Sequence, residues 1–90
     1  MIFDYDPQKS SANKTKHGVD FEEAKLVWHD DDVILLTSAY SAESRFLAIG
    51  HIYNKLWTVI FALRSDTIRI ISARRSRESE VAYYEKNKNT

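Results

Sequence analysis

Polar and apolar residues in the first third of the chain follow a helical pattern. Asp6-Pro7 is an N-cap followed by proline at the first helical position, which predicts a helix over residues 7–16. Gly18 is suited to end this helix in the left-handed conformation. Asp20-x-x-Glu23 is an approximate capping box and predicts a second helix that runs through Trp28. Because the first helix is almost entirely polar, we expect it on the surface with one edge against the body.

From residue 33 onward, β-branched and leucine-rich runs of strand length replace the helical spacing. The pattern predicts four strands, at residues 33–37, 45–52, 56–64 and 67–73. Short turns at Tyr53-Asn54-Lys55 and Ser65-Asp66 join the last three strands, so we expect an antiparallel meander. Within the third strand, residues 56–63 are apolar on both faces except at Thr58, which predicts a central strand covered on both sides.

The end of the chain favours a third helix, over residues 75–86, followed by a frayed tail at 87–90. Residues 2–4 are a candidate for a short extra edge strand. The expected fold class is therefore α+β, with two N-terminal helices, a four-stranded mainly antiparallel sheet and a C-terminal helix. Ninety residues suffice for one modest core, so we expect residues 1–90 to form a single domain.

Composition narrows the class of protein. The chain has no cysteine, which excludes a disulfide scaffold and a thiolate zinc site and suits a reducing cytoplasm. The N-terminus lacks the apolar segment of a signal peptide, and the longest later apolar run, residues 59–63, is too short to span a bilayer. Glycine occurs only at Gly18 and Gly50, so glycine-rich phosphate loops are absent and no cofactor is expected.

The net charge of zero hides an uneven distribution. Residues 1–42 hold four lysines against eight acids, whereas residues 43–90 hold nine lysines and arginines against five acids. The two parts therefore carry charges of −4 and +4. They either complement each other within the fold, or the basic part provides a phosphate-binding face.

Arginines at predicted strand ends are the most informative group, and they are Arg45, Arg64, Arg69, Arg74, Arg75 and Arg77. Each is either a solvated or salt-bridged surface residue or part of a phosphate site. Guanidinium groups bind phosphate bidentately and suit the pentacoordinate phosphorane that forms when an RNA 2′-hydroxyl attacks its own phosphate. Since Arg64 and Arg69 flank one turn and Arg74 falls toward the opposite end, they need not form one site.

Such cleavage needs no metal but benefits from a general base and acid. The candidates are His17, Glu43, Glu80 and Tyr84, with His29 and His51 behind them. His17 is alternatively a C-terminal helix cap, and the Asp30–Asp32 run is better explained as a solvated loop or strand cap than as a metal site.

Several stretches of the chain resemble one toxin family. They are Phe3-Asp4-Tyr5-Asp6-Pro7-x-Lys9, Asn13-x-x-Lys16-His17-Gly18-Val19-x-Phe21-Glu22-Glu23-Ala24, Ile68-Arg69-Ile70-Ile71-Ser72-Ala73-Arg74-Arg75 and Glu80-x-x-x-Tyr84. With these segments, the chain is similar to BrnT toxins. The resemblance implies a RelE-like fold, metal-independent RNA cleavage that halts translation, and neutralisation by an antitoxin of the BrnA type. That antitoxin is a ribbon-helix-helix protein, and it alone would contact DNA when the complex represses its operon.

Under this hypothesis the chain is an endoribonuclease. Arg64 and Arg74 contact the phosphate and transition state, His17 or Glu43 transfers a proton, and Tyr84 orients the substrate. The expected RNA-binding residues are Lys9, Lys16, Arg45, Arg69, Arg75 and Arg77. The last helix is less basic than is usual in the family, so a non-catalytic module that pairs with a DNA-binding partner remains the alternative. A stand-alone RNA-binding domain is a third interpretation.

Overall fold

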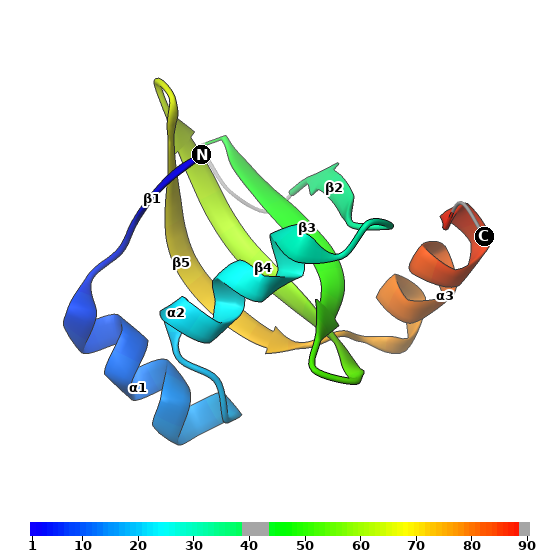
Figure 1. Cartoon of the computed structure of the whole chain (residues 1–90), viewed down its shortest axis with the longest axis horizontal. Coiled ribbons are helices and arrows are strands. Elements are labelled where there is room, and N and C mark those ends of the chain that lie inside the picture. The colour runs from blue at the N-terminus through cyan, green and yellow to red at the C-terminus, as the bar shows by residue number, and fades with distance from the viewer. Residues whose placement is uncertain (39–43, 89–90) are drawn as a thin grey trace.

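The computed structural model of the chain describes residues 1–38 and 44–88. The elements in chain order are β1 (Ile2–Asp4), α1 (Pro7–His17), α2 (Phe21–Ala24), the 3₁₀ helix η1 (Lys25–His29), β2 (Ile34–Thr37), β3 (Arg45–Ile52), β4 (Lys55–Arg64), β5 (Thr67–Arg75) and α3 (Glu78–Asn87). Figure 1 shows α2 in front of the sheet, α1 at the lower left beyond β5, and α3 at the side where β2 and β3 lie. The predicted α+β class is confirmed.

The sheet has five strands in the order β1-β5-β4-β3-β2. The prediction of four strands was therefore one too low. The candidate strand at residues 2–4 is real because Ile2–Asp4 pairs in parallel with the first three residues of β5. The other neighbours are antiparallel, and β4 lies at the centre as predicted.

One irregularity interrupts the pairing of β4 with β5. Ile60 pairs with Ser72, whereas the next residue, Phe61, pairs with Ile70. Ile71 is thus an extra residue, a β-bulge, and the alternation of side chains changes phase there.

The face of the sheet toward α1, α2 and η1 carries the main core. Phe21 and Val27 from the helical side pack with Val59 and Phe61 of β4. Gly50 lies under η1, and a Cβ atom at this position would be 2.9 Å from the Val27 carbonyl oxygen. Glycine at position 50 therefore lets the 3₁₀ helix approach the sheet closely.

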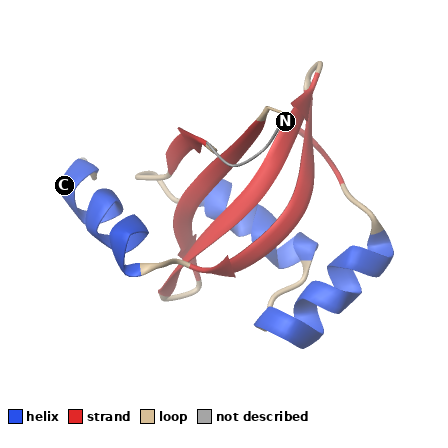
Figure 2. Cartoon of the chain, turned by 180° about the vertical axis from the view of Figure 1, so that it is seen from behind, coloured by secondary structure: helices blue, strands red, loops and turns tan. Residues whose placement is uncertain are grey.

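The opposite face of the sheet is covered only in part. Figure 2 views the chain from this side and shows α1 and α2 behind the sheet and α3 beside it. Thr58 at the α3 end of β4 is fully buried, whereas Ile60 is half-buried and Arg64 is exposed. The expectation that β4 is covered on both sides was correct for only part of its length. We call this surface the open face.

The predicted helix starts and stops are mostly confirmed. The Asp6 side chain accepts a hydrogen bond from the Gln8 N–H, and Gly18 ends α1 with φ of 100°. The capping box of Asp20 with Glu23 is present, although the second helix becomes 3₁₀ after Ala24. No helix in the described ranges is long and apolar enough to span a membrane.

The boundaries differ most at the end of the chain. The last helix begins at Glu78 instead of residue 75, because Arg74 and Arg75 continue β5 by pairing with Thr58 and Trp57. The predicted frayed tail begins where α3 ends, at Asn87, and its last two residues lie outside the described ranges.

A polar edge attaches α1 to the sheet, as its composition requires. Asn13 donates from Nδ2 to the carbonyl oxygens of Val19 (2.8 Å) and Ala73 (2.9 Å), and its Oδ1 accepts from the Ala73 N–H (3.2 Å). Ser10 Oγ accepts from the Phe21 N–H. Ala12, the one clearly apolar residue of the helix, is exposed. Hydrogen bonds rather than apolar contacts thus define the inner edge of α1.

Candidate functional site

Four of the six arginines lie on the open face. The register places Arg45 and Arg69 on either side of Ala62, and Arg64 follows Ala62 on the same face of β4. Arg74 pairs with Thr58 at the other end of this face. Because the bulge shifts the phase of β5, Arg69 and Arg74 share the face although one has an odd and the other an even number.

A groove of about 610 Å³ lies on the open face beside the start of α3. It is lined by Ser38, Leu47, Ile60, Arg74, Arg77, Ser79 and Glu80. Arg74 forms a bidentate ion pair with Glu80, with Nη1–Oε1 and Nη2–Oε2 distances of 2.8 and 2.9 Å. The guanidinium is therefore held in one orientation at the wall of the groove.

Glu80 is the centre of a hydrogen-bond network under α3. Besides Arg74, its Oε1 accepts from the Thr58 hydroxyl (2.9 Å) and from the backbone N–H of Arg77 (2.7 Å). Burial on its own raises the pKa of this carboxyl, but the hydrogen bonds from Arg74, Arg77 and Thr58 outweigh it and lower the pKa to about 2. Glu80 is thus a permanent anion that positions Arg74, and it is too weak a base to take a proton at neutral pH.

The second basic group lies at the far end of the open face. Arg64 is exposed, and Arg69 donates from Nη1 to Asp4 Oδ2 at 2.6 Å. Arg45 is half-buried, and its Nε makes no hydrogen bond within the described ranges. Only one of these three guanidinium groups is paired with a carboxylate of the described chain.

The structure separates the two arginines that were expected to act together. Arg74 pairs with Thr58, six residues before Arg64 on β4, which corresponds to about 20 Å along the strand. The two side chains share a face, but a single phosphate cannot contact both. The sequence-based assignment of both residues to one transition state is corrected accordingly.

The remaining predicted basic residues lie in different places. His17, Lys9 and Lys16 belong to α1, which lies along the β5 edge of the sheet and away from the groove. Arg75 faces the covered side of the sheet, with its guanidinium 5.8 Å from the centroid of the Trp57 ring. Arg77 precedes α3 and lines the groove. Glu43 lies outside the described ranges.

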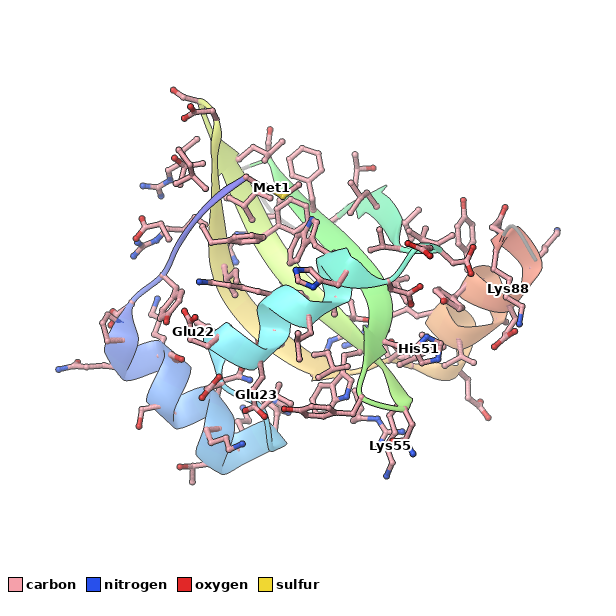
Figure 3. All side chains as sticks on the ribbon, in the orientation of Figure 1. Met1, Glu22, Glu23, His51, Lys55 and Lys88 are labelled. Atoms are coloured by element: carbon pink, nitrogen blue, oxygen red, sulfur yellow. The ribbon has the colours of Figure 1, made fainter. Side chains whose placement is uncertain are left out.

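Tyr84 is buried, and its hydroxyl does not face the groove. It donates to Asp30 Oδ2 at 2.7 Å, and the same oxygen accepts from the backbone N–H of His51 (2.8 Å) and lies 3.0 Å from His51 Nδ1. Figure 3 shows His51 between the end of β3 and α3. Burial and the nearby Asp30 carboxylate raise the pKa of Tyr84, so its hydroxyl stays protonated. In this arrangement Tyr84 attaches α3 and does not reach a substrate in the groove.

Sequence reasoning named Asp30 only as part of the Asp30–Asp32 run and did not connect it with His51 or Tyr84. Burial raises the pKa of the Asp30 carboxyl, but hydrogen bonds from the Asp32 N–H, the Tyr84 hydroxyl and His51 outweigh burial and lower it to about 2. The interpretation of the aspartate run as a cap was correct for Asp30, because it caps the edge of β3. Across residues 1–38 and 44–88, no three His, Asp or Glu side chains are grouped to hold a metal ion.

Comparison with models of protein families identifies the family of the chain. The model of the family described as "Ribonuclease toxin, BrnT, of type II toxin-antitoxin system" matches residues 5–80. No curated protein is similar enough to the chain to count as a match. The matched region runs from the residue after β1 to Glu80, so it contains the open-face arginines and the carboxylate that holds Arg74. The chain therefore belongs to the BrnT family of ribonuclease toxins of type II toxin-antitoxin systems.

Proposed function

We propose that this ribonuclease toxin cleaves RNA in the open-face groove without a metal ion. The 2′-oxygen of a ribose attacks the adjacent phosphorus while the bond from phosphorus to the 5′-oxygen breaks. The 2′-hydroxyl loses one proton and the leaving 5′-oxygen gains one, so the products are a 2′,3′-cyclic phosphate and a 5′-hydroxyl. The phosphorane carries extra negative charge, which a fixed guanidinium stabilises more than it stabilises the ground state.

The orientation of Arg74 carries this proposal. Glu80 occupies one edge of the guanidinium, and the side chain remains partly exposed at the wall of the groove, where Arg77 and Ser79 add polar groups. A guanidinium that is already held loses little conformational entropy when phosphate binds. Glu80 is thus a positioning residue. Of the two residues predicted to transfer a proton, His17 ends α1 and does not line the groove, and Glu43 remains a prediction from the sequence alone.

The chemistry is tested with purified toxin and a defined RNA oligonucleotide. We expect cleavage to persist in excess EDTA and to leave a 2′,3′-cyclic phosphate. Replacing the ribose at the cleaved position by 2′-deoxyribose should prevent cleavage there, since the nucleophile is missing. Cleavage of the deoxy position, or complete loss of activity in EDTA with the protein still folded, would contradict the proposed reaction.

The role of Arg74 is tested with Arg74→Lys, which keeps the charge beside Glu80 and removes the planar fork. We expect the cleavage rate to fall on the order of a hundredfold. Arg75→Lys makes the same chemical change on the covered side and should alter the rate less than twofold. Thermal unfolding of both variants controls for stability. Equal losses in the two variants would remove Arg74 from the proposed site.

We further propose that the toxin is neutralised by an antitoxin of the BrnA type, whose ribbon-helix-helix domain supplies the contacts to DNA. A protein partner is supported by an apolar groove of about 330 Å³ between the N-terminus and β2. Met1, Leu35 and Leu63 line it and are more than half exposed. Exposed apolar patches of this kind mark protein-binding surfaces.

The ion pair of Arg74 with Glu80 also favours one alternative, a non-catalytic module that only pairs with a DNA-binding partner. Part of the guanidinium is occupied in this pair, which would weaken phosphate binding if the pair never adjusts. Induction of the toxin alone separates the two functions. Growth arrest that is lost in Arg74→Lys supports cleavage, whereas soluble protein that does not affect growth supports the binding module.

A further inference from the structure

The open face has two basic ends with an apolar surface between them. Arg74 and Arg77 lie beside α3 at one end, and the cluster of Arg45, Arg64 and Arg69 lies at the other. Between them lie Leu47 and Ile60, which pair across β3 and β4 and form the apolar side of the groove, while the buried Ala62 lies between Arg45 and Arg69. Along β4, Arg64 lies about 20 Å from the residue that pairs with Arg74, and the level of Arg45 and Arg69 lies about 13 Å from it.

We propose that the substrate is single-stranded RNA that lies along the open face, with the Arg45–Arg64–Arg69 cluster binding a backbone phosphate several nucleotides away from the one that is cleaved. The inference rests on the proposed function and adds the substrate class and a second binding site. In it, Arg64 binds the substrate and does not contact the reacting phosphate.

The hydrogen-bonding state of the three arginines supports a phosphate ligand. Arg64 is exposed and makes no ion pair within the described ranges, and the Nε of Arg45 has no hydrogen-bond partner there. Arg69 is paired with Asp4, which limits the net charge of the cluster and holds this guanidinium at the β1 edge. The exposed donors of Arg64 are thus available to a phosphate, the Nε of Arg45 is buried, and Arg69 is held beside them by its ion pair.

The middle of the face supports a single strand rather than a duplex. Leu47 and Ile60 are half-buried on neighbouring strands, and Ala62 is small. The apolar side of this groove can receive unstacked bases, whereas a duplex would present only its charged backbone to it. Along the open face, an arginine group is followed by apolar side chains and then by a second arginine group. This order corresponds to a phosphate, bases and a second phosphate of one RNA strand.

The test uses ¹⁵N-labelled toxin and two uncleavable 2′-O-methyl RNAs, a dinucleotide and an oligonucleotide of about eight nucleotides. We expect the dinucleotide to shift amide signals near Arg74 only. The longer RNA should also shift signals at the Arg64 end. Arg64→Ala should weaken binding of the longer RNA about three- to fivefold and leave dinucleotide binding unchanged.

Salt dependence gives an independent measure of the lost phosphate contact. For the longer RNA, the slope of log affinity against log salt should decrease by roughly 0.7 in Arg64→Ala. Lys55→Ala is the matched control, because it removes one exposed positive charge from the other end of β4. It should change neither the slope nor the affinity for either RNA.

The outcomes separate this inference from the proposed function. If the longer RNA shifts signals at one end only, or if Lys55→Ala weakens binding as much as Arg64→Ala does, the second site is overturned while cleavage at Arg74 can stand. If neither RNA binds the unmodified toxin, the open face is not an RNA interface and both are overturned.

Discussion

At each edge of the sheet, backbone groups that the short edge strand leaves unpaired are hydrogen-bonded by a side chain, and the two edges use different side chains. Where β1 ends, Asn13 hydrogen-bonds the outer backbone groups of β5: it donates to the Ala73 carbonyl oxygen and accepts from the Ala73 N–H. Beyond β2, the edge of β3 is satisfied by Asp30, which accepts from the His51 N–H. Both edge strands are short, so a polar side chain continues the pairing where each of them ends.

Because one side chain is an amide and the other a carboxylate, the two residues differ in the further groups that they can bind. Asn13 is neutral and its donors and acceptor are all used by backbone groups, so it fixes α1 and nothing more. Asp30 can only accept, and its charge also binds the Tyr84 hydroxyl and the His51 ring. The carboxylate therefore joins α3 to the sheet, and its hydrogen bonds depend on pH whereas those of Asn13 do not.

Replacing the Asn13 amide by a carboxylate at the β5 edge should lower the stability of the protein more than the other substitutions do. In Asn13→Asp, one oxygen can still accept from the Ala73 N–H, but the other faces the carbonyl oxygens of Val19 and Ala73. A buried charge without a donor should lower the free energy of unfolding by about 4 kcal/mol. Urea denaturation of wild type and variant at pH 7 measures this difference in the free energy of unfolding.

Ser11→Asp is the control for this exchange, because it adds the same charge to an exposed position of α1. It should change the free energy of unfolding by less than about 0.5 kcal/mol. If the two variants behave alike, Asn13 does not hold the edge of β5 as described.

The reverse exchange, Asp30→Asn, should cost about 2 kcal/mol at pH 7. The folded-state pKa of Asp30, about 2, lies below the ordinary value of 3.8, so its contribution is present above pH 4 and is lost as the pH falls toward 2. The difference between wild type and variant should therefore shrink from about pH 5 to pH 2. Glu80 titrates in both proteins and its contribution cancels, so the difference in unfolding free energy reports the titration of Asp30. A difference that stays constant over this range would contradict the assignment.

Tyr84→Phe should have the smallest effect on stability of the three. It removes one hydrogen bond to Asp30, which keeps its other donors, and should lower the free energy of unfolding by about 1.5 kcal/mol. Because the hydroxyl is buried away from the groove, RNA cleavage by the folded variant should change less than twofold. A loss of cleavage much larger than the loss of stability would restore the sequence-based role of Tyr84 in orienting the substrate.

Local signals explain why much of the fold could be predicted. The caps at Asp6 and Gly18 act within one turn of α1, so the sequence was sufficient to place that helix. The start of α3 was missed because residues 74 and 75 extend β5 only through pairing with distant residues of β4. The inner edge of α1 was likewise beyond local reasoning, since Asn13 bonds to a backbone sixty positions later.

The candidate site was less predictable than the fold. The arginines could be recognised as phosphate-binding candidates from their type, but strand pairing and the bulge decide which of them share a face. Asp30, His51 and Tyr84 are far apart in the chain, and no local pattern indicates that they meet. The separation of Arg64 from Arg74 follows from their places at opposite ends of a strand pair, which the meander already suggested.

The extra residue in β5 also determines which changes in length this strand can accept. Deleting Ile71 would restore regular pairing, because Ile70 and Ser72 already pair with the adjacent residues Phe61 and Ile60 and would keep their faces. A second inserted residue without a second bulge would instead turn one half of β5 over relative to the other. Either Arg69 would then point into the core, or Arg74 would leave Glu80 buried without its partner. The spacing between Arg69 and Arg74 can therefore shorten by the bulge residue, whereas an insertion would separate the two arginines onto opposite faces.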